Sequence, residues 1–261
     1  MDDPEDPHHG WLYRKPGDEP MTNSRGHGEF ICDDLLIPDK VTNAPSVRAV
    51  YEMVNDTDGP FTTPLLWDKK SGTIVSNEST DIMRMINDEF DDFATKEMTL
   101  YPESPLAEEL QKLNDDVIYP KINNGVYRCG FAKTQKAYDT AVHELFDALQ
   151  LVEDKLSGQR FLGGNDLSWL DLRLFMTLVR FDPVYTTYFK TNIKRLVDYP
   201  NLLGFTRDVY QSFPEIRDSI SMSHIKTHYF TSHPVLNTYG IIPRYDGPDL
   251  TVPSGRDKQF S

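Results

Sequence analysis

Cysteine, positive charge and long hydrophobic runs are scarce in this sequence, and each shortage excludes a class of protein. Only two cysteines occur in 261 residues, so no disulfide framework is expected and a reducing compartment, cytoplasmic or organellar, is favoured. Lys and Arg number 27 against 41 Asp and Glu. The resulting net charge of -14 repels phosphate backbones, which argues against nucleic-acid binding.

The sequence also lacks the hydrophobic segments that direct a chain to a membrane. No apolar run approaches the ~20 residues of a transmembrane helix, so no membrane span is expected. The first residues, MDDPEDPHHG, are acidic, whereas signal and transit peptides are basic near their start. We therefore expect no targeting peptide within the printed chain, and a cleaved one is left open.

What the sequence does contain is a change of pattern near residue 92, which predicts two domains. Residues 1–92 hold short strand and helix patterns and are interpreted as an α/β domain. Residues 93–104 are acidic and aperiodic, which is typical of a linker. In residues 105–235 apolar side chains recur at helical spacing and predict an all-helical domain, and the Pro- and Gly-rich residues 236–261 predict an extended tail.

Within the first domain the pattern predicts a strand, a helix, a hairpin and a second helix, in that order. The strand covers Gly10–Arg14, and the first helix follows Pro45. The hairpin consists of Phe61–Trp67 and Thr73–Ser76, and the second helix starts at Glu78.

The strongest local signal in the second domain is a helix start at Ser168. Asp171 stands three residues later, a variant of the capping box, with Leu167 and Leu172 at the hydrophobic staple positions. This pattern predicts a buried helix start that serves folding and not chemistry. The helices predicted in this domain cover residues 106–118, 133–158, 167–182 and 202–212.

Pro64 falls inside the first strand of the hairpin, where it cannot donate a ladder hydrogen bond. Such a proline is restricted to an edge or a bulge, unless the Thr63–Pro64 bond is cis. A cis bond would turn the N–H and C=O of Thr63 outward, where they could pair with the backbone of a peptide ligand.

The next element begins with Glu78 and Ser79, two side chains that suit the end of a peptide. A helix N-terminus attracts a carboxylate, the Ser79 hydroxyl can donate to it, and Glu78 can pair with an ammonium group. With Thr63 they describe a site for a short peptide that carries an α-amino and an α-carboxyl group at one end, such as glutathione. The alternative, from these residues alone, is an ordinary hairpin followed by a polar helix cap.

Six stretches carry a resemblance to a known family. They are GWLY at 10–13, TPLLWDKKSGTIVSNES at 63–79, INNGVYRCGFAKTQKAYD at 122–139, DLRLFMTLVRFDPVYTTYFK at 171–190, DYPNL at 198–202 and SHIKTHYFTSH at 223–233. By these stretches the chain resembles the glutathionyl-hydroquinone reductases, the Xi class of the glutathione transferases. The resemblance implies the glutathione transferase fold, a thioredoxin-like α/β domain (incomplete here) followed by an all-α domain.

The resemblance also implies a reaction and the residues that serve it. Glutathione is the cosubstrate, no metal is needed, and a cysteine thiolate attacks the thioether sulfur of a glutathionyl-hydroquinone. Tyr127 and Tyr229 would face the aromatic, quinone-type substrate, because phenols donate hydrogen bonds while their rings stack. The alternative for these two tyrosines is core packing with the hydroxyl bonded to the backbone. The residues implied for the glutathione site are Trp11, Thr63, Pro64, Glu78 and Ser79.

The printed sequence departs from the family in its nucleophile. The family's cysteine lies in a Cys-Pro-Trp-Ala motif ahead of the Gly-Trp strand, and this sequence contains no such motif. Cys32 precedes two aspartates, which disfavour a thiolate, and Cys129 is most simply a small buried residue. We therefore assign no catalytic residue from the sequence.

The missing motif leaves several hypotheses about function open. Without the first strand and helix of the thioredoxin-like domain, the Thr63 strand would have an open edge, which another segment or chain would have to cover. The chain could be a reductase whose nucleophile lies elsewhere, a glutathione-binding protein without turnover, or a non-catalytic, transferase-like interaction subunit of a larger assembly. The resemblance implies a homodimer.

A metal site is not expected. His224 and His228 are four residues apart and could share a helix face, but no third ligand stands out nearby, although His233 is possible. We interpret both as structural residues.

Overall fold

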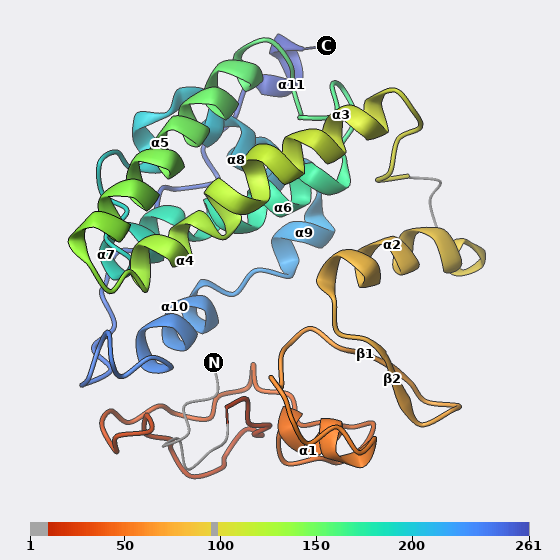
Figure 1. Ribbon diagram of the computed structural model, residues 1–261, viewed down its shortest axis with the longest axis vertical. Coiled ribbons are helices and arrows are strands. Elements are labelled where there is room, and N and C mark those ends of the chain that lie inside the picture. Colours follow the sequence, from red (N-terminus) through yellow and green to blue (C-terminus); the bar gives the residue numbers. More distant parts are fainter. Residues whose placement is uncertain (1–9, 95–98, 261) are drawn as a thin grey trace. The chain divides into compact units, whose positions relative to one another are not determined.

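The structure, a computed structural model, describes residues 10–94 and 99–260, which form two compact units (Figure 1). The N-terminal unit comprises Met1–Glu97 together with Phe230–Ile242. The helical unit comprises Met98–Tyr229 together with Pro243–Ser261. Phe230–Ile242 therefore belongs to the N-terminal unit although it follows the helices of the second unit. The sequence pattern had divided this segment between the helical domain, residues 105–235, and the tail, residues 236–261.

The N-terminal unit is built from short elements around α1 (Val47–Met53). Ser46 caps this helix by accepting a hydrogen bond from the N–H of Ala49 at 3.2 Å. Its buried face carries Val47, Val50 and Tyr51, the helical spacing that the sequence predicted. The strand expected at residues 10–14 is reduced to a single bridge between Leu12 and Ser46.

The hairpin is present but shorter than the sequence predicted. Strands β1 (Leu66–Asp68) and β2 (Thr73–Ser76) pair antiparallel, with an irregularity between Leu66 and Trp67. The predicted first strand, from Phe61, is therefore wrong before Leu66. A ladder over Pro64 would lack a donor, because proline has no N–H.

Helix α2 (Ser79–Glu89) starts one residue after the predicted start at Glu78, which is its N-cap residue. The acidic segment after it is more regular than expected, since a 3-10 turn, η1, covers Asp91–Phe93. The predicted linker, residues 93–104, thus overlaps this turn only at Phe93. Its residues 95–98 lie outside the described residues.

The second unit is all-helical, as the sequence predicted. Helices α5, α6 and α8 supply its most buried apolar side chains, among them Leu145, Phe175 and Phe205. In the part of the chain that the structure describes, no helix combines the length and hydrophobicity needed to cross a membrane. The helices and turns are α3 Leu106–Leu113, η2 Asn114–Asn123, α4 Gly125–Gly130, α5 Gln135–Ser157, α6 Trp169–Arg180, η3 Phe181–Tyr185, α7 Thr186–Tyr188, η4 Leu196–Asp198, α8 Pro200–Ser212, α9 Pro214–Asp218, α10 Met222–Thr231 and α11 Arg256–Gln259.

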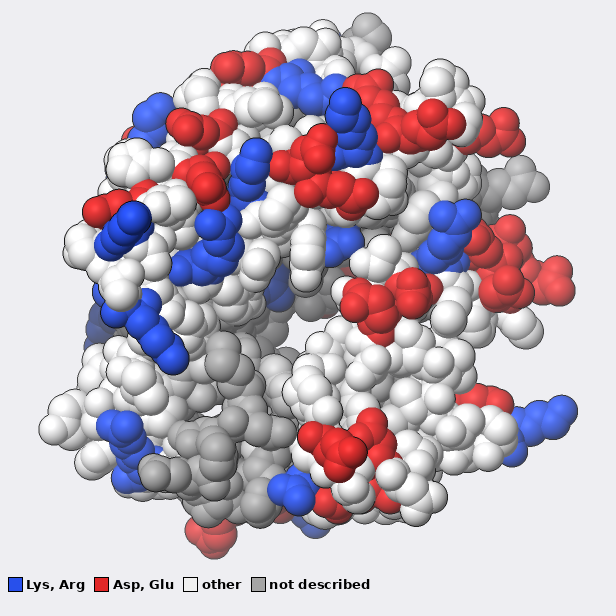
Figure 2. Space-filling model, in the orientation of Figure 1, with Lys and Arg blue, Asp and Glu red and all other residues white. Residues whose placement is uncertain are grey.

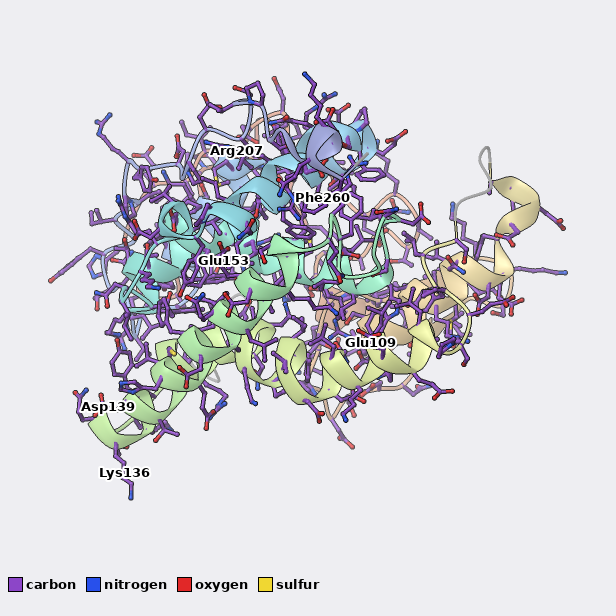
Figure 3. All side chains as sticks on the ribbon, turned by 90° about the horizontal axis from the view of Figure 1, so that it is seen from above. Glu109, Lys136, Asp139, Glu153, Arg207 and Phe260 are labelled. Atoms are coloured by element: carbon purple, nitrogen blue, oxygen red, sulfur yellow. The ribbon has the colours of Figure 1, made fainter. Side chains whose placement is uncertain are left out.

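Buried carboxylates join these helices. Asp171 forms the predicted capping box with Ser168, and its other oxygen accepts the N–H of Leu162 at 2.6 Å. Glu153, on α5, caps the start of α8 by accepting the N–H of Asn201 at 2.9 Å and that of Leu202 at 2.7 Å (Figure 3). These bonds satisfy helix N–H groups that would otherwise be buried without partners.

The tail differs from the extended segment that was expected. A short helix, α11, lies at its end, and the buried Arg256 donates to the carbonyls of Leu156, Gln159 and Arg160 at 2.7–2.9 Å. Three of the last carbonyl groups of α5 and its following turn are satisfied in this way. The end of the tail, around Arg256, is therefore part of the core of the helical unit.

Candidate functional site

The start of α2 presents a carboxylate and a hydroxyl side by side at the surface. Glu78 is the N-cap residue, and its Oε1 accepts the N–H of Thr80 at 3.2 Å. The Ser79 hydroxyl donates to the same oxygen at 3.3 Å, and both side chains are exposed. The local structure thus fixes the Glu78 carboxylate at a helix end while leaving it accessible to a ligand.

Thr63 and Pro64, the second part of the predicted site, lie on an exposed loop before β1. The Thr63–Pro64 bond is cis, one of the three options that the sequence left open for Pro64. Within the described residues, neither the N–H nor the C=O of Thr63 takes part in a hydrogen bond. The backbone of Thr63 is therefore available to an extended ligand.

A buried tyrosine links these two surfaces. The Tyr51 hydroxyl donates to the carbonyl of Thr62 at 2.9 Å and accepts from the Asn77 side-chain amide at 3.1 Å. Thr62 directly precedes Thr63, and Asn77 directly precedes Glu78. The sequence analysis counted Tyr51 only as part of an apolar helix face, because nothing in the local pattern shows where its hydroxyl goes.

Trp11 is placed beside the start of α1. Its carbonyl accepts the N–H of Val47 at 3.0 Å, next to the Leu12–Ser46 bridge. The side chain is exposed. The structure therefore puts Trp11 in the same unit as Thr63 and Glu78, and its role toward a ligand stays a prediction.

In the helical unit three tyrosines form a chain of hydroxyl groups. The Tyr127 oxygen lies 2.6 Å from that of Tyr229, which lies 2.8 Å from that of Tyr185. Tyr185 and Tyr229 are buried, whereas Tyr127 is 37% exposed. The sequence singled out Tyr127 and Tyr229 but missed Tyr185. The one available signal was its position inside the 171–190 stretch, which carries part of the family resemblance.

The backbone that presents Tyr185 is irregular. Helix α6 gives way to a π-helical segment, η3 (Phe181–Tyr185), which contains Pro183. The wider turn changes the direction in which side chains leave the helix, a feature often found at functional sites. Tyr185 thus faces Tyr229 on α10, which simple 3.6-residue periodicity does not predict.

Phe189 and Gly130 support the tyrosine chain. The Phe189 ring stacks on Tyr185, with centroids 5.4 Å apart and an angle of 13°. Phe189 also packs against Gly130, where a Cβ atom would lie 2.2 Å from its Cδ1. Only glycine allows this approach, so α4 and the rings are fitted to each other.

Burial decides how the three hydroxyls share their protons. It raises the pKa of Tyr185 and of Tyr229 well above the usual value, so both phenols stay protonated. A buried phenol proton without an acceptor is costly, and from this cost we infer the donor order Tyr185 to Tyr229 and Tyr229 to Tyr127. The proton of Tyr127 is then left for a ligand or solvent. Because each bond polarises the next, Tyr127 becomes a stronger donor.

Neither cysteine has the surroundings of a nucleophile. Cys129 is 1% exposed, and burial raises its pKa to about 11, against a smaller lowering by Arg128. Cys32 is also buried, with its Sγ 3.6 Å from the carbonyl of Glu19. A reactive thiolate needs access and stabilisation by positive charge or a helix N-terminus. Burial of Cys129 agrees with its sequence interpretation as a small buried residue. That the chain holds no catalytic cysteine stays a prediction.

Other features add no chemistry to this site. A shallow pocket of about 480 Å³ lies at the start of α5, with the cations Arg128 and Lys136 on its wall, and contains none of the predicted site residues. The described residues include no group of three or more His, Cys, Asp or Glu side chains that could hold a metal. Acidic and basic side chains are intermingled on the face of the molecule in Figure 2.

Comparisons with known proteins identify the family of this chain. Residues 135–208 match the family model "Glutathione S-transferase, C-terminal domain". The chain is 48% identical over 202 residues to the glutathionyl-hydroquinone reductase YqjG of Escherichia coli K12, covering 77% of this chain and 61% of that protein. It is 41% identical over 225 residues to the glutathionyl-hydroquinone reductase PcpF of Sphingobium chlorophenolicum, covering 86% of this chain and 70% of that protein.

Solved structures give the same result. The glutathione-bound structure of YqjG superposes with a TM-score of 0.82 at 42% identity, covering 93% of this chain and 78% of that one. An Xi-class glutathione transferase from Natrialba magadii gives a TM-score of 0.83 at 41% identity, covering 92% and 73%. The chain thus spans about 60 to 80% of the length of the relatives it matches.

Proposed function

Because this chain belongs to the glutathionyl-hydroquinone reductases, the Xi class of the glutathione transferase family, we propose that it binds glutathione joined by a thioether to an aromatic diol. Relatives are named for that reaction, and one was solved with glutathione bound. The chain covers 61% of the E. coli relative, so its own activity is inferred from its residues.

We assign the peptide part of the ligand to the N-terminal unit. The Glu78 carboxylate pairs with the α-ammonium of glutathione, and Ser79 with the first N–H groups of α2 receives the α-carboxylate. The N–H and C=O of Thr63 bind the ligand backbone as a neighbouring strand would. Exposure of all three residues supports this assignment.

We assign the aromatic part to the tyrosine chain, which is the observation that carries the proposal. Tyr127 is exposed and holds the free proton of a three-phenol chain, so it can donate to a hydroquinone oxygen. Its ring offers a stacking surface. Tyrosines that served only packing would direct their hydroxyls to backbone carbonyls, as the half-buried Tyr138 does toward Lys190.

The reaction places a further demand on the site. A thiolate attacks the thioether sulfur, an S–S bond forms, the S–C bond breaks, and the ring takes the electron pair and a proton. A hydrogen bond from Tyr127 stabilises the charge that develops on the ring oxygen. Because Cys32 and Cys129 are buried and Cys129 has a raised pKa, we assign the attack to a thiolate other than these two.

The experiment measures binding and turnover separately. Titration calorimetry with glutathione and with a glutathionyl-hydroquinone should show tighter binding of the latter, because only it carries a diol ring to which Tyr127 can donate a hydrogen bond. The double variant Glu78→Gln, Ser79→Ala should lower the affinity for both ligands. Tyr127→Phe should lower the affinity for the glutathionyl-hydroquinone alone. Equal affinity of the wild type for the two ligands would remove the aromatic site from the proposal.

Release of hydroquinone with excess glutathione tests turnover. If Cys32→Ser and Cys129→Ser retain the wild-type rate, neither thiol is the nucleophile. Binding without any release would instead favour a glutathione-binding, non-catalytic role for the chain.

A further inference from the structure

Tyr51 occupies an unusual place between the two halves of the proposed glutathione site. Its side chain is 2% exposed, and its ring packs on Phe61 with centroids 5.6 Å apart. The Arg48 guanidinium lies over the Phe61 ring, with its Cζ 5.3 Å from the ring centroid. The loop before Thr63 is thus held against α1 by ring contacts as well as by the Tyr51 hydroxyl.

The Tyr51 hydroxyl makes two hydrogen bonds, and its two partners come from different segments of the chain. It donates to the Thr62 carbonyl, 11 residues away, and accepts from the Asn77 amide, 26 residues away. Each partner immediately precedes a residue of the proposed site, Thr63 in one case and Glu78 in the other. One buried oxygen therefore sets the distance between a loop and a helix start.

We propose that Tyr51 is a positioning residue whose hydroxyl fixes the spacing between the Thr63 backbone and the Glu78–Ser79 pair. The inference rests on the proposed binding of glutathione and adds the group that aligns the site. A ligand that contacts both surfaces gains full affinity only if they are held at the correct separation. Without the hydroxyl, part of the binding energy is spent on aligning them.

Asn77 acts only through Tyr51 in this arrangement. Its amide donates to the Tyr51 hydroxyl, and its exposed side chain has no other hydrogen bond within the described residues. Removal of the Asn77 amide should therefore affect ligand binding only while the Tyr51 hydroxyl is present.

The test is a double-mutant cycle on the glutathione dissociation constant of the full chain. Tyr51→Phe keeps the ring and removes the hydroxyl. It should lower the affinity for glutathione about three- to tenfold, the usual effect of a lost hydrogen bond. Asn77→Ala should lower the affinity for glutathione about two- to fivefold. In the Tyr51→Phe background, Asn77→Ala should have no further effect, because its partner is gone.

A matched control separates alignment from general stability. Tyr138→Phe removes a hydroxyl that donates to the carbonyl of Lys190 at 2.6 Å in the helical unit. Both Tyr138→Phe and Tyr51→Phe should lower the melting temperature, but Tyr138→Phe should leave the glutathione affinity unchanged. Equal losses of affinity in the two variants would overturn the inference.

The outcomes distinguish the inference from its premise. If the wild type does not bind glutathione, the proposed function and the inference both fall. If the wild type binds and Tyr51→Phe binds equally well, the inference alone is overturned. Should Tyr51→Phe not fold, Asn77→Ala carries the test, because the side chain it shortens is exposed, and unchanged affinity in that variant overturns the inference.

Discussion

The phenol oxygens of Tyr127 and Tyr229 lie 2.6 Å apart although 102 residues separate them in the chain. With Tyr185 they form an ordered series of donors that ends at the exposed member. This arrangement makes the contribution of each tyrosine to ligand binding unequal and measurable.

Tyr229→Phe should lower the affinity for a glutathionyl-hydroquinone about three- to tenfold. The reason is that Tyr127 loses the hydrogen bond that polarises it and Tyr185 loses its acceptor. The affinity for glutathione itself should not change. Calorimetric titration of both ligands checks this, with Tyr138→Phe as the control. A parallel loss for both ligands would contradict the specific role of the tyrosine chain.

The stability of the fold should fall at alkaline pH. Tyrosine in an unfolded chain ionises near pH 10, whereas burial raises the pKa of Tyr199 to about 12 and also raises the pKa values of Tyr185 and Tyr229. The stabilisation is complete below pH 10 and is lost as the pH rises above it toward the folded pKa values. Melting temperatures from pH 8 to 12 should decline above pH 10, less steeply in Tyr185→Phe. A flat profile would contradict the burial argument.

Gly130→Ala should disturb the aromatic site without touching a ligand. The added Cβ would meet the ring of Phe189 at 2.2 Å, and Phe189 stacks on Tyr185. Overpacking of this kind costs about 1–3 kcal/mol of stability, and the shifted ring should weaken the aromatic ligand. Gly158→Ala is the control, because its Cβ would find its nearest neighbour at 4.0 Å. Thermal unfolding and ligand titration of both variants decide the matter.

Asp171→Ala should destabilise the helical unit by at least about 2 kcal/mol, because the N–H groups of Leu162 and Ser168 would be left buried without acceptors. Asp198→Ala removes an exposed carboxylate that accepts the N–H of Arg195 and should cost about 1 kcal/mol or less. Urea unfolding of the two variants provides the comparison. Similar costs would show that burial of the cap does not matter.

Local patterns predicted the local structure well. The capping box at Ser168 and Asp171 was predicted because its bonds join residues three apart. The helix start at Ser79 followed from the residues that directly precede it. The hairpin strand from Phe61 was predicted too long, since pairing depends on the register with a partner strand as well as on its own residues.

The candidate site was predictable only in part. Thr63, Glu78 and Ser79 stand close in the sequence and could be grouped by their chemistry. Tyr185 was missed because a π-helical segment changes the phase of the helix that presents it. Tyr51 was missed because its partners, Thr62 and Asn77, are recognisable only once α1 lies against the segments that flank the hairpin.

The sequence alone determined the family, the order of the helices and the residue types from which a peptide site and an aromatic site could be built, since these follow from motifs and from spacing along the chain. The tertiary structure decided which hydroxyl meets which acceptor. A hydroxyl's partner depends on contacts between segments that the sequence pattern does not connect. For that reason the Tyr127–Tyr229–Tyr185 chain and the Tyr51 link emerged only from the folded protein.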